Sequence, residues 1–114
     1  MMIIKQGVSM PNYRAIVNYQ FKSGMENKGM TFLQNELVKK AQSMGCHNIE
    51  LCQSETDHCH VVGIATWNSI DEARDFQAVW QTKEHELAKL CAVAPKREFF
   101  IIAATFAEKA RRAA

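Results

Sequence analysis

The sequence lacks any apolar run long enough to cross a membrane, and it carries almost no net charge. A membrane-spanning helix needs about 20 consecutive apolar residues, and no segment approaches that length. The apolar residues 1–4 are too few for a secretory signal, and Lys5 follows them instead of preceding them. We therefore expect a cytoplasmic protein without a membrane partner. The 14 basic and 12 acidic residues leave a net charge of +2, which is too small to indicate a nucleic-acid partner.

The sequence also lacks the cysteine pairs of disulfide-stabilised or zinc-binding domains. It contains 4 cysteines and no CxxC pair, and a domain with enough apolar residues for a core does not depend on disulfides. We therefore expect free thiols. The segment 57–60 (DHCH) has ligand atoms for a soft metal, but alternate strand residues point to opposite faces and the three His and Cys side chains do not converge. We expect no metal site.

No Ser/His/Asp arrangement, glycine-rich phosphate loop or closely spaced pair of carboxylates stands out. Hydrolase and kinase functions therefore have no support. With 114 residues, 47% of them hydrophobic, the chain can form one domain that buries about two thirds of its unfolded surface. Since Pro11 breaks the pattern before the first strand, we expect an N-terminal extension at 1–12, a domain at 13–106 and an alanine-rich tail at 107–114.

The clearest structural signal is the segment 59–76 (CHVVGIATWNSIDEARDF). Its first half is apolar and rich in β-branched residues, which predicts a buried strand over 59–67. Ser69 and Glu72 then have the spacing of a capping box, which predicts the start of a helix. The apolar residues that follow at helical spacing are Ala73, Phe76 and Trp80.

Three further segments have strand patterns. Residues 13–21 alternate between apolar and polar, and residues 46–54 and 97–106 are short and rich in apolar side chains. The polar link 55–58 joins the second of these strands to the one at 59–67, which indicates a hairpin. The last strand is almost wholly apolar, which is typical of a strand covered on both faces.

Two helices are expected between the strands. Ser23 and Glu26 form a second capping box, which predicts a helix that ends just before Gly45. The other helix begins after Ser69, and the polar residues 81–84 interrupt its apolar stripe, so we expect a bend or two short helices there. The apolar stripe of the first helix consists of Met30, Leu33, Leu37, Ala41 and Met44.

The order strand, helix, strand, strand, helix, strand is the ferredoxin-like βαββαβ pattern of an α+β fold with a four-stranded antiparallel sheet. Right-handed crossovers place both helices on one face of the sheet. The other face still carries apolar residues such as Val62 and Ile64, and an apolar face of this size does not remain in water. A second copy is the simplest cover. We therefore expect a homodimer whose two sheets pack face to face as a barrel.

The segment 65–76 (ATWNSIDEARDF), together with the turn after Phe21 and the helix end at Gly45, resembles the antibiotic-biosynthesis-monooxygenase type of dimeric α+β barrel. The resemblance covers residues 13–106, and its most specific part is the W-x-S-x-x-x-A pattern that starts at Trp67. It implies a structural role for Trp67 and a ligand cavity between the sheet and the helices of each subunit. Members of the family include cofactor-independent oxygenases acting on aromatic polyketides or quinols, haem-degrading enzymes and proteins without a defined activity.

The haem-degrading branch of this family adds an Asn on the first strand, a Trp in the second helix and a His further along. In this sequence Asn18 lies one residue out of phase with the first position, and Phe76 stands at the Trp position. His85 lies one residue before the His position, which Glu86 occupies. The resemblance leaves haem binding through His85 open as an alternative.

Five residues are candidates for a site. Asn18 and Gln20 share one face of the first strand, and a buried amide needs a hydrogen-bond partner, either internal or on a ligand. Phe76 and Trp80 lie one helical turn apart, either as core residues or as walls of a cavity for a flat ligand. His85 is either a solvated surface residue or a proton carrier. We expect Asn18 and His85 to be catalytic, and Phe76, Trp80 and Gln20 to bind substrate.

Two functions fit these residues. The first is a cofactor-independent monooxygenase-like protein, whose cavity orients and desolvates a small aromatic substrate that itself supplies electrons to oxygen. The second is a non-catalytic dimer that binds a small hydrophobic ligand, or haem through His85. Neither requires a resident cofactor. Both predict that Asn18 and His85 face one enclosed cavity, and a space filled with side chains would instead indicate a structural dimer.

Overall fold

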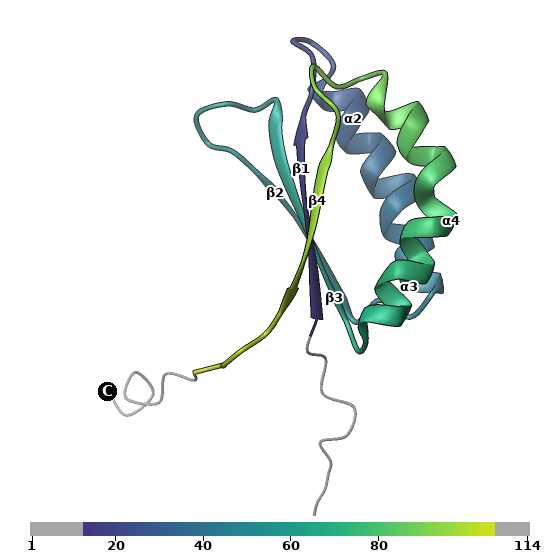
Figure 1. Ribbon diagram of the computed structural model, residues 1–114. Helices are drawn as coiled ribbons and strands as arrows, with labels where there is room; N and C mark the ends of the chain where they lie inside the picture. The colour runs from purple at the N-terminus through teal and green to yellow at the C-terminus, as the bar shows by residue number, and fades with distance from the viewer. Residues whose placement is uncertain (1–12, 107–114) are drawn as a thin grey trace, which may run out of the picture.

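A four-stranded antiparallel sheet forms the centre of the computed structural model, which describes residues 13–106 (Figure 1). Its strands are β1 (Tyr13–Gln20), β2 (Asn48–Gln53), β3 (His60–Trp67) and β4 (Lys96–Ile101). The strand order is β2-β3-β1-β4, and every neighbouring pair is antiparallel. This is the predicted ferredoxin-like α+β architecture.

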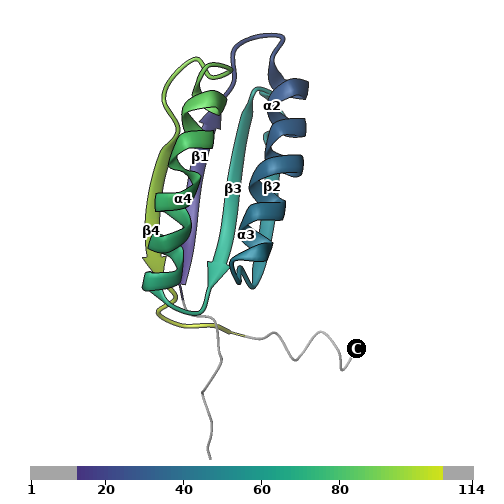
Figure 2. The same cartoon turned by 90° about the vertical axis from the view of Figure 1, so that its right-hand side faces the viewer.

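The helical segments all lie on one face of the sheet, as right-handed crossovers require. Figure 2 shows α4 (Ile70–Ala88) over β1 and β4, and the other helical region over β2 and β3. That other region is a single run of α2 (Glu26–Phe32), the π-helical segment η1 (Leu33–Val38) and α3 (Lys39–Ser43). Among the described residues, no helix has both the length and the apolar character needed to span a bilayer. The predicted extension and tail lie outside the described residues.

The predicted cap of the first helix is wrong. The residue before Glu26 is Met25, and no side chain caps the helix there. Gly24, with a φ of 84°, instead turns the chain, and the Met25 amide closes that turn by donating to the Lys22 carbonyl at 2.9 Å. Ser23 therefore lies in the turn instead of at the helix start. The predicted helix end is confirmed, because α3 stops just before Gly45, whose φ is 96°.

The second helix begins as predicted but does not bend. The Ser69 hydroxyl accepts a hydrogen bond from the Glu72 amide at 3.2 Å, and the helix then continues without interruption through Ala88. The expected break at 81–84 is wrong because Glu84 is not a solvated residue that ends the apolar stripe. Its carboxylate forms an ion pair with Arg97 of β4, so a charged residue stands on the sheet-facing side of the helix.

The core lies between the sheet and the helices. Alternate residues of β1 and β3 face the helices and are buried, in the register that pairs Tyr13 with Trp67 and Tyr19 with Val61. The first helical region contributes the buried Leu33, Leu37 and Ala41, which belong to its predicted stripe. The buried residues of α4 are Ala73, Phe76, Trp80 and Leu87. Burial of each large apolar side chain contributes about 1.5–3 kcal/mol.

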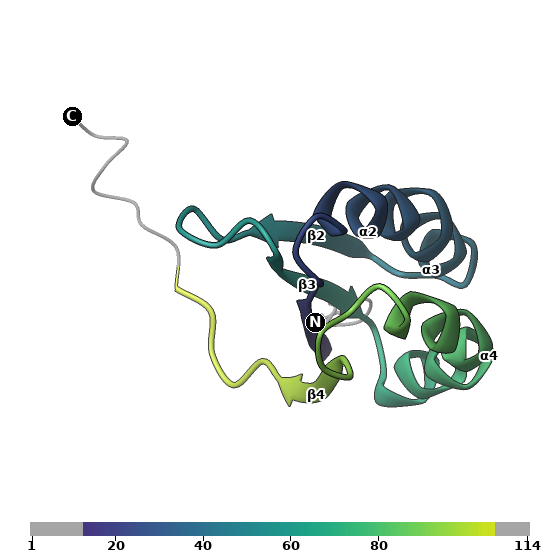
Figure 3. The ribbon, with the colours of Figure 1, turned by 90° about the horizontal axis from the view of Figure 1, so that it is seen from above.

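No helix of the described chain covers the other face of the sheet (Figure 3). Ile16 and Ile64 are paired on this open face and are partly exposed, as is Val62. β4 is an edge strand that ends at Ile101, and Phe100 and Ile101 are 42% and 68% exposed. The prediction that the last strand spans 97–106 and is covered on both faces is therefore wrong for the described chain.

Candidate functional site

The five predicted site residues lie in three different parts of the structure. Phe76 and Trp80 are buried beneath α4, with ring centroids 6.0 Å apart and ring planes 14° from parallel. Asn18 and Gln20 point to the open face of the sheet, and His85 lies on the exposed side of α4. Asn18 and His85 therefore do not face one enclosed cavity, and the five residues do not form a single site.

Both polar residues of β1 have hydrogen-bond partners near the start of β3. The side-chain oxygen Oδ1 of Asn18 lies 3.0 Å from His60 Nε2, and the side-chain nitrogen Nε2 of Gln20 donates to Asp57 Oδ2 at 3.1 Å. These partners belong to the chain itself, so neither amide needs a ligand to complete its hydrogen bonding.

The cysteines and histidines of the described residues form no reactive centre. All four cysteines are free thiols, as predicted. Burial raises the pKa of the Cys91 thiol, which keeps it protonated and poorly nucleophilic. Within residues 13–106, no three His, Cys, Asp or Glu side chains are placed to hold a metal ion.

A small apolar cavity lies between the sheet and the helices. Small residues of β1 and β3 form its floor, and bulky residues of β3, η1 and α4 close one end. Its volume is about 20 Å³, which is room for about one water molecule. A larger ligand therefore has to displace side chains. The small residues are Ala15, Gly63 and Ala65, and the bulky residues are Trp67, Leu37 and Phe76.

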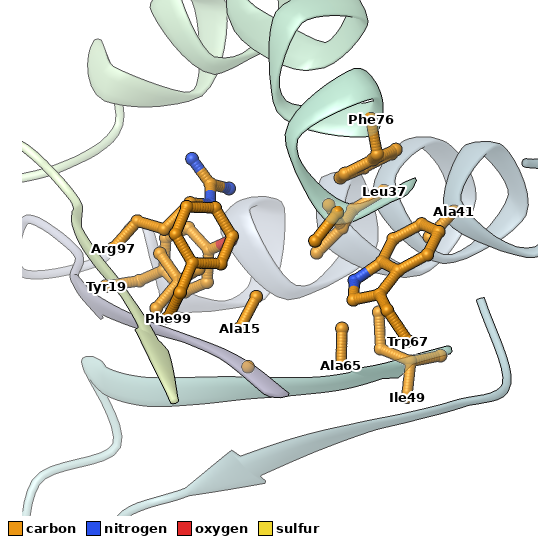
Figure 4. Close-up of a pocket in the computed structure, with 13 residues that line it drawn as sticks. Ala15, Tyr19, Leu37, Ala41, Ile49, Ala65, Trp67, Phe76, Arg97 and Phe99 are labelled. Carbon is orange, nitrogen blue, oxygen red and sulfur yellow. The ribbon is translucent and has the colours of Figure 1, made fainter. Parts of the chain in front are cut away.

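The other end of the cavity is polar. Figure 4 shows Tyr19, Arg97 and Phe99 gathered there, opposite Trp67 and Phe76. The Tyr19 hydroxyl is fully buried and has no hydrogen-bond partner. Burial is the main cause that raises the pKa of Tyr19 well above its ordinary value of 10.0, so the phenol remains protonated and able to donate.

An ion pair between strand and helix holds Arg97 at this end. Arg97 Nη1 donates to Glu84 Oε1 at 2.7 Å, and the two side chains are 8% and 23% exposed. Because the pair is largely shielded from water, its attraction is stronger than that of a surface salt bridge. β4 supplies the guanidinium and α4 the carboxylate, so the pair also fixes how the helix lies over the edge of the sheet.

The backbone at Gly63 gives the Tyr19 ring its place. A Cβ atom at Gly63 would lie 3.4 Å from Tyr19 Cε2 and 4.0 Å from the hydroxyl oxygen. The missing side chain therefore leaves space for the ring beside β3. On its other side the ring stacks on Phe21, with centroids 6.1 Å apart and planes within 4°. These contacts fix the direction in which the hydroxyl points.

Two contacts link the helical regions to each other. Phe32 packs edge-on against Trp80, with centroids 6.1 Å apart, and Lys83 forms an ion pair with Glu36 at 3.4 Å. Leu37 of the π-helical segment η1 reaches the cavity below them. π-Helical turns are rare and often occur at functional sites.

The sequence did not predict Tyr19, Glu84 or Arg97 as site residues. Tyr19 has the spacing of an ordinary core residue of β1, Glu84 belongs to the polar residues 81–84, and Arg97 is the first residue of the predicted last strand. A signal for them does exist, because Glu84 lies four residues after Trp80 on the buried stripe and Arg97 is in phase with Phe99 on β4. A charge of each sign at core-facing positions of consecutive elements indicates a buried pair.

No protein-family profile and no curated protein sequence matches the chain. Solved structures do match it. A cofactor-independent oxygenase from Streptomyces nogalater is 16% identical, with a TM-score of 0.73 over 87% of this chain and 100% of that one. A monooxygenase from Streptomyces coelicolor in complex with nanaomycin D is 16% identical, with a TM-score of 0.72 over 87% and 94%. A dimeric ferredoxin-like protein from an uncultured marine organism is 9% identical, with a TM-score of 0.70 over 89% and 96%.

Other matching structures are assigned as antibiotic biosynthesis monooxygenases. At such low identity, a likeness of this kind shows the fold and leaves the activity to be argued from the site. The chain thus has the ferredoxin-like α+β fold of the antibiotic-biosynthesis-monooxygenase type, as the resemblance predicted.

Proposed function

We propose that the protein is a cofactor-independent monooxygenase-like enzyme that acts on a small hydrophobic aromatic substrate held between the sheet and the helices. The observation that carries the proposal is the buried Tyr19 hydroxyl, which has no partner and lies beside Arg97 in an otherwise apolar cavity. A few convergent polar groups in an apolar pocket are typical of a small-molecule site. The two Streptomyces proteins with this fold are oxygenases, and one of them holds nanaomycin D.

The Tyr19 hydroxyl at the polar end of the cavity suits a substrate that ends in a carbonyl oxygen. An aromatic ketone with an acidic CH2 group, such as anthrone, would accept a hydrogen bond from Tyr19 at its carbonyl oxygen. When the CH2 group loses a proton to water, negative charge develops on that oxygen. The hydrogen bond from Tyr19 would stabilise this developing charge more than it stabilises the neutral ketone, which is what lowers a barrier.

The substrate itself would supply the electrons. The carbanion transfers one electron to O2, the two radicals combine at carbon, and protonation by water gives a hydroperoxide. Loss of water then breaks the O–O bond and forms a new carbonyl group. One oxygen atom of O2 enters the product and the other leaves as water, so the substrate carbon provides all four electrons and no cofactor is consumed. The apolar walls of the cavity would orient the carbanion for this reaction.

Phe76 is the predicted substrate-binding residue that lines this cavity, and we propose it as a wall of the site. Trp80 stacks behind it and would support it. The predicted substrate contact of Gln20 and the predicted catalytic roles of Asn18 and His85 stay predictions. Their side chains lie on other surfaces, so in this proposal they do not touch the substrate.

Oxygen consumption with anthrone as the probe tests the proposal. We expect uptake above the uncatalysed rate, with one O2 consumed per anthrone and a loss of at least about tenfold in Tyr19→Phe, where one hydrogen bond to the developing charge is removed. Arg74→Gln, an exposed change on α4, is the matched control. Binding of anthrone without uptake would favour the alternative, a non-catalytic binding protein. Neither binding nor uptake would leave only a structural dimer.

We also propose that two copies pair through the open faces of their sheets. Ile16, Val62, Ile64 and Phe100 form a partly exposed apolar surface there that no described helix covers. A protein of the same fold is dimeric, and a two-fold dimer covers the same patch on both subunits at once. Light scattering at micromolar concentration should give about twice the chain mass of 13.0 kDa. A mass of one chain would contradict this proposal.

A further inference from the structure

The polar end of the cavity also determines which ligands it can admit, provided that the cavity is used as a ligand site, as proposed above. Arg97 is the charged residue among those that line it. Its charge is already matched, because Glu84 accepts a hydrogen bond from its guanidinium at 2.7 Å and the pair is largely buried. The net charge at this end is therefore zero before any ligand binds.

A carboxylate would fit this end poorly. It would have to lose its hydration shell on entering an apolar cavity, and the positive charge of the guanidinium that could replace that hydration is already paired with Glu84. The ligand would thus bring a second negative charge to a shielded pair that holds a single positive one. Repulsion between like charges is strong where water does not screen it.

A ligand that ends in a neutral oxygen brings no second negative charge to the ion pair. The Tyr19 hydroxyl is buried, lacks a partner and is held in one direction by Phe21 and Gly63. Because burial raises the pKa of Tyr19 above its ordinary value, the hydroxyl remains a donor across the neutral pH range. A ketone, quinone or phenol oxygen would satisfy it with one hydrogen bond.

We propose that the cavity selects aromatic ligands that end in a neutral oxygen and rejects the corresponding carboxylates. Tyr19 is the binding donor, and Glu84 is the residue that determines selectivity, since it neutralises Arg97. Glu84 acts through Arg97 and does not itself touch the ligand. Removing the negative charge at Glu84 should therefore change which ligand the site prefers as well as the affinity of binding.

Binding of two probes of similar shape tests this: the ketone acetonaphthone and the anion naphthoate, titrated at pH 7 by calorimetry under argon. We expect the protein to bind the ketone at least about tenfold more tightly, a difference typical of one hydrogen bond gained against one charge left unmatched. Tyr19→Phe should weaken binding of the ketone by about tenfold and leave the affinity for naphthoate unchanged. Glu84→Gln should reverse the preference, because Arg97 then lacks its carboxylate.

Glu86→Gln is the matched control, since it removes the same charge from an exposed position of the same helix. It should leave both affinities unchanged. If Glu84→Gln does not fold, the double variant Glu84→Gln with Arg97→Gln removes both charges together and should still prefer the ketone.

The binding results distinguish the proposed ligand selectivity from the proposed oxygenase activity. If the unmodified protein binds naphthoate as tightly as the ketone, the selectivity is overturned and the cavity remains a ligand site. If neither probe binds, both the selectivity and the use of the cavity are overturned. Preferential ketone binding in a protein that does not consume oxygen with anthrone upholds the selectivity and overturns only the oxygenase.

Discussion

On the helix side of the sheet β1 buries Ala15, Val17 and Tyr19 almost completely, whereas on the opposite side Ile16 and its neighbours Val62 and Ile64 remain partly exposed. The same strands and the same alternation produce both faces. The difference arises because the helices within residues 13–106 cover one face only. A sheet face becomes a core only when another layer covers it, so the inner face is completed within the chain and the open face is not.

The two faces of the sheet therefore have different proposed functions. The inner face belongs to an apolar interior in which the Tyr19 hydroxyl and the Trp80 indole nitrogen have no hydrogen-bond partner, and we propose that this interior holds a ligand. The open face has a partly exposed apolar centre with amides that are already paired, Asn18 with His60 and Gln20 with Asp57. We propose it as the surface that contacts a second copy.

The largest effect should come from removing a side chain of the inner face. Trp67 is 1% exposed and packs against Phe76, with ring centroids 5.5 Å apart. Trp67→Ala should lower the free energy of unfolding by about 3–5 kcal/mol, because the cavity left behind is only partly refilled. Urea denaturation followed by circular dichroism measures this. Val79→Ala, at a position that is 48% exposed, should change stability little, and an equal loss in both variants would contradict the comparison.

A charge on the open face should change assembly instead of the fold. Ile64→Glu places a carboxylate at the centre of the proposed interface, and two-fold symmetry brings the two new carboxylates together. Light scattering should then give the mass of one chain, with a helical circular dichroism spectrum unchanged. Val79→Glu, on the outer side of α4, serves as the control and should leave the dimer intact. A dimer that survives in Ile64→Glu would show that the open face is not the interface.

High pH should act through the polar end of the inner face. Burial raises the pKa of Tyr19 above its ordinary value of 10.0, so the unfolded chain loses this proton at a lower pH than the folded chain does. The unfolded state then binds fewer protons, and stability falls as the pH rises above about 10. Tyr19→Phe should make the decline in melting temperature between pH 9 and 12 shallower. Identical declines in both proteins would show that the hydroxyl is not buried.

The smallest effect should come from the amide of the open face. Asn18→Ala removes one hydrogen bond to His60 and should lower stability by about 0.5–1.5 kcal/mol. Oxygen uptake with anthrone should not change, because the side chain faces away from the cavity. The exposed change His85→Ala should leave uptake unchanged as well. A large loss of uptake in either variant would instead restore the catalytic roles predicted from the sequence.

Much of the fold could be predicted because it depends on local patterns. The alternation in β1, the buried stripe through Leu33, Leu37 and Ala41, and the cap at Ser69 each lie within a few consecutive residues. Two local predictions were wrong where a more distant contact or a turn intervened. Arg97 stabilises the charged residue of α4 that was expected to end or bend the helix, and the turn at Gly24 separates Ser23 from the helix start.

The candidate site could be predicted only in part. Phe76 lines the small apolar cavity, and its place follows from the apolar stripe of one helix, while its predicted contact with a substrate stays a prediction. Tyr19 could not be distinguished from other core residues, since the lack of a partner for its hydroxyl depends on every side chain that surrounds it. The phase of β1 placed Asn18 and Gln20 together, but which neighbour satisfied each amide depended on the position of β3.

The sequence by itself determined the order of strands and helices, the faces that each element buries, and the presence of a sheet face that one chain leaves uncovered. These follow from periodicities within single elements. Only the tertiary structure decided that Glu84 meets Arg97, that the Tyr19 hydroxyl is left without a partner and that Asn18 and His85 lie on separate surfaces. Such contacts depend on how whole elements lie relative to one another, which is fixed by the packing of the complete core.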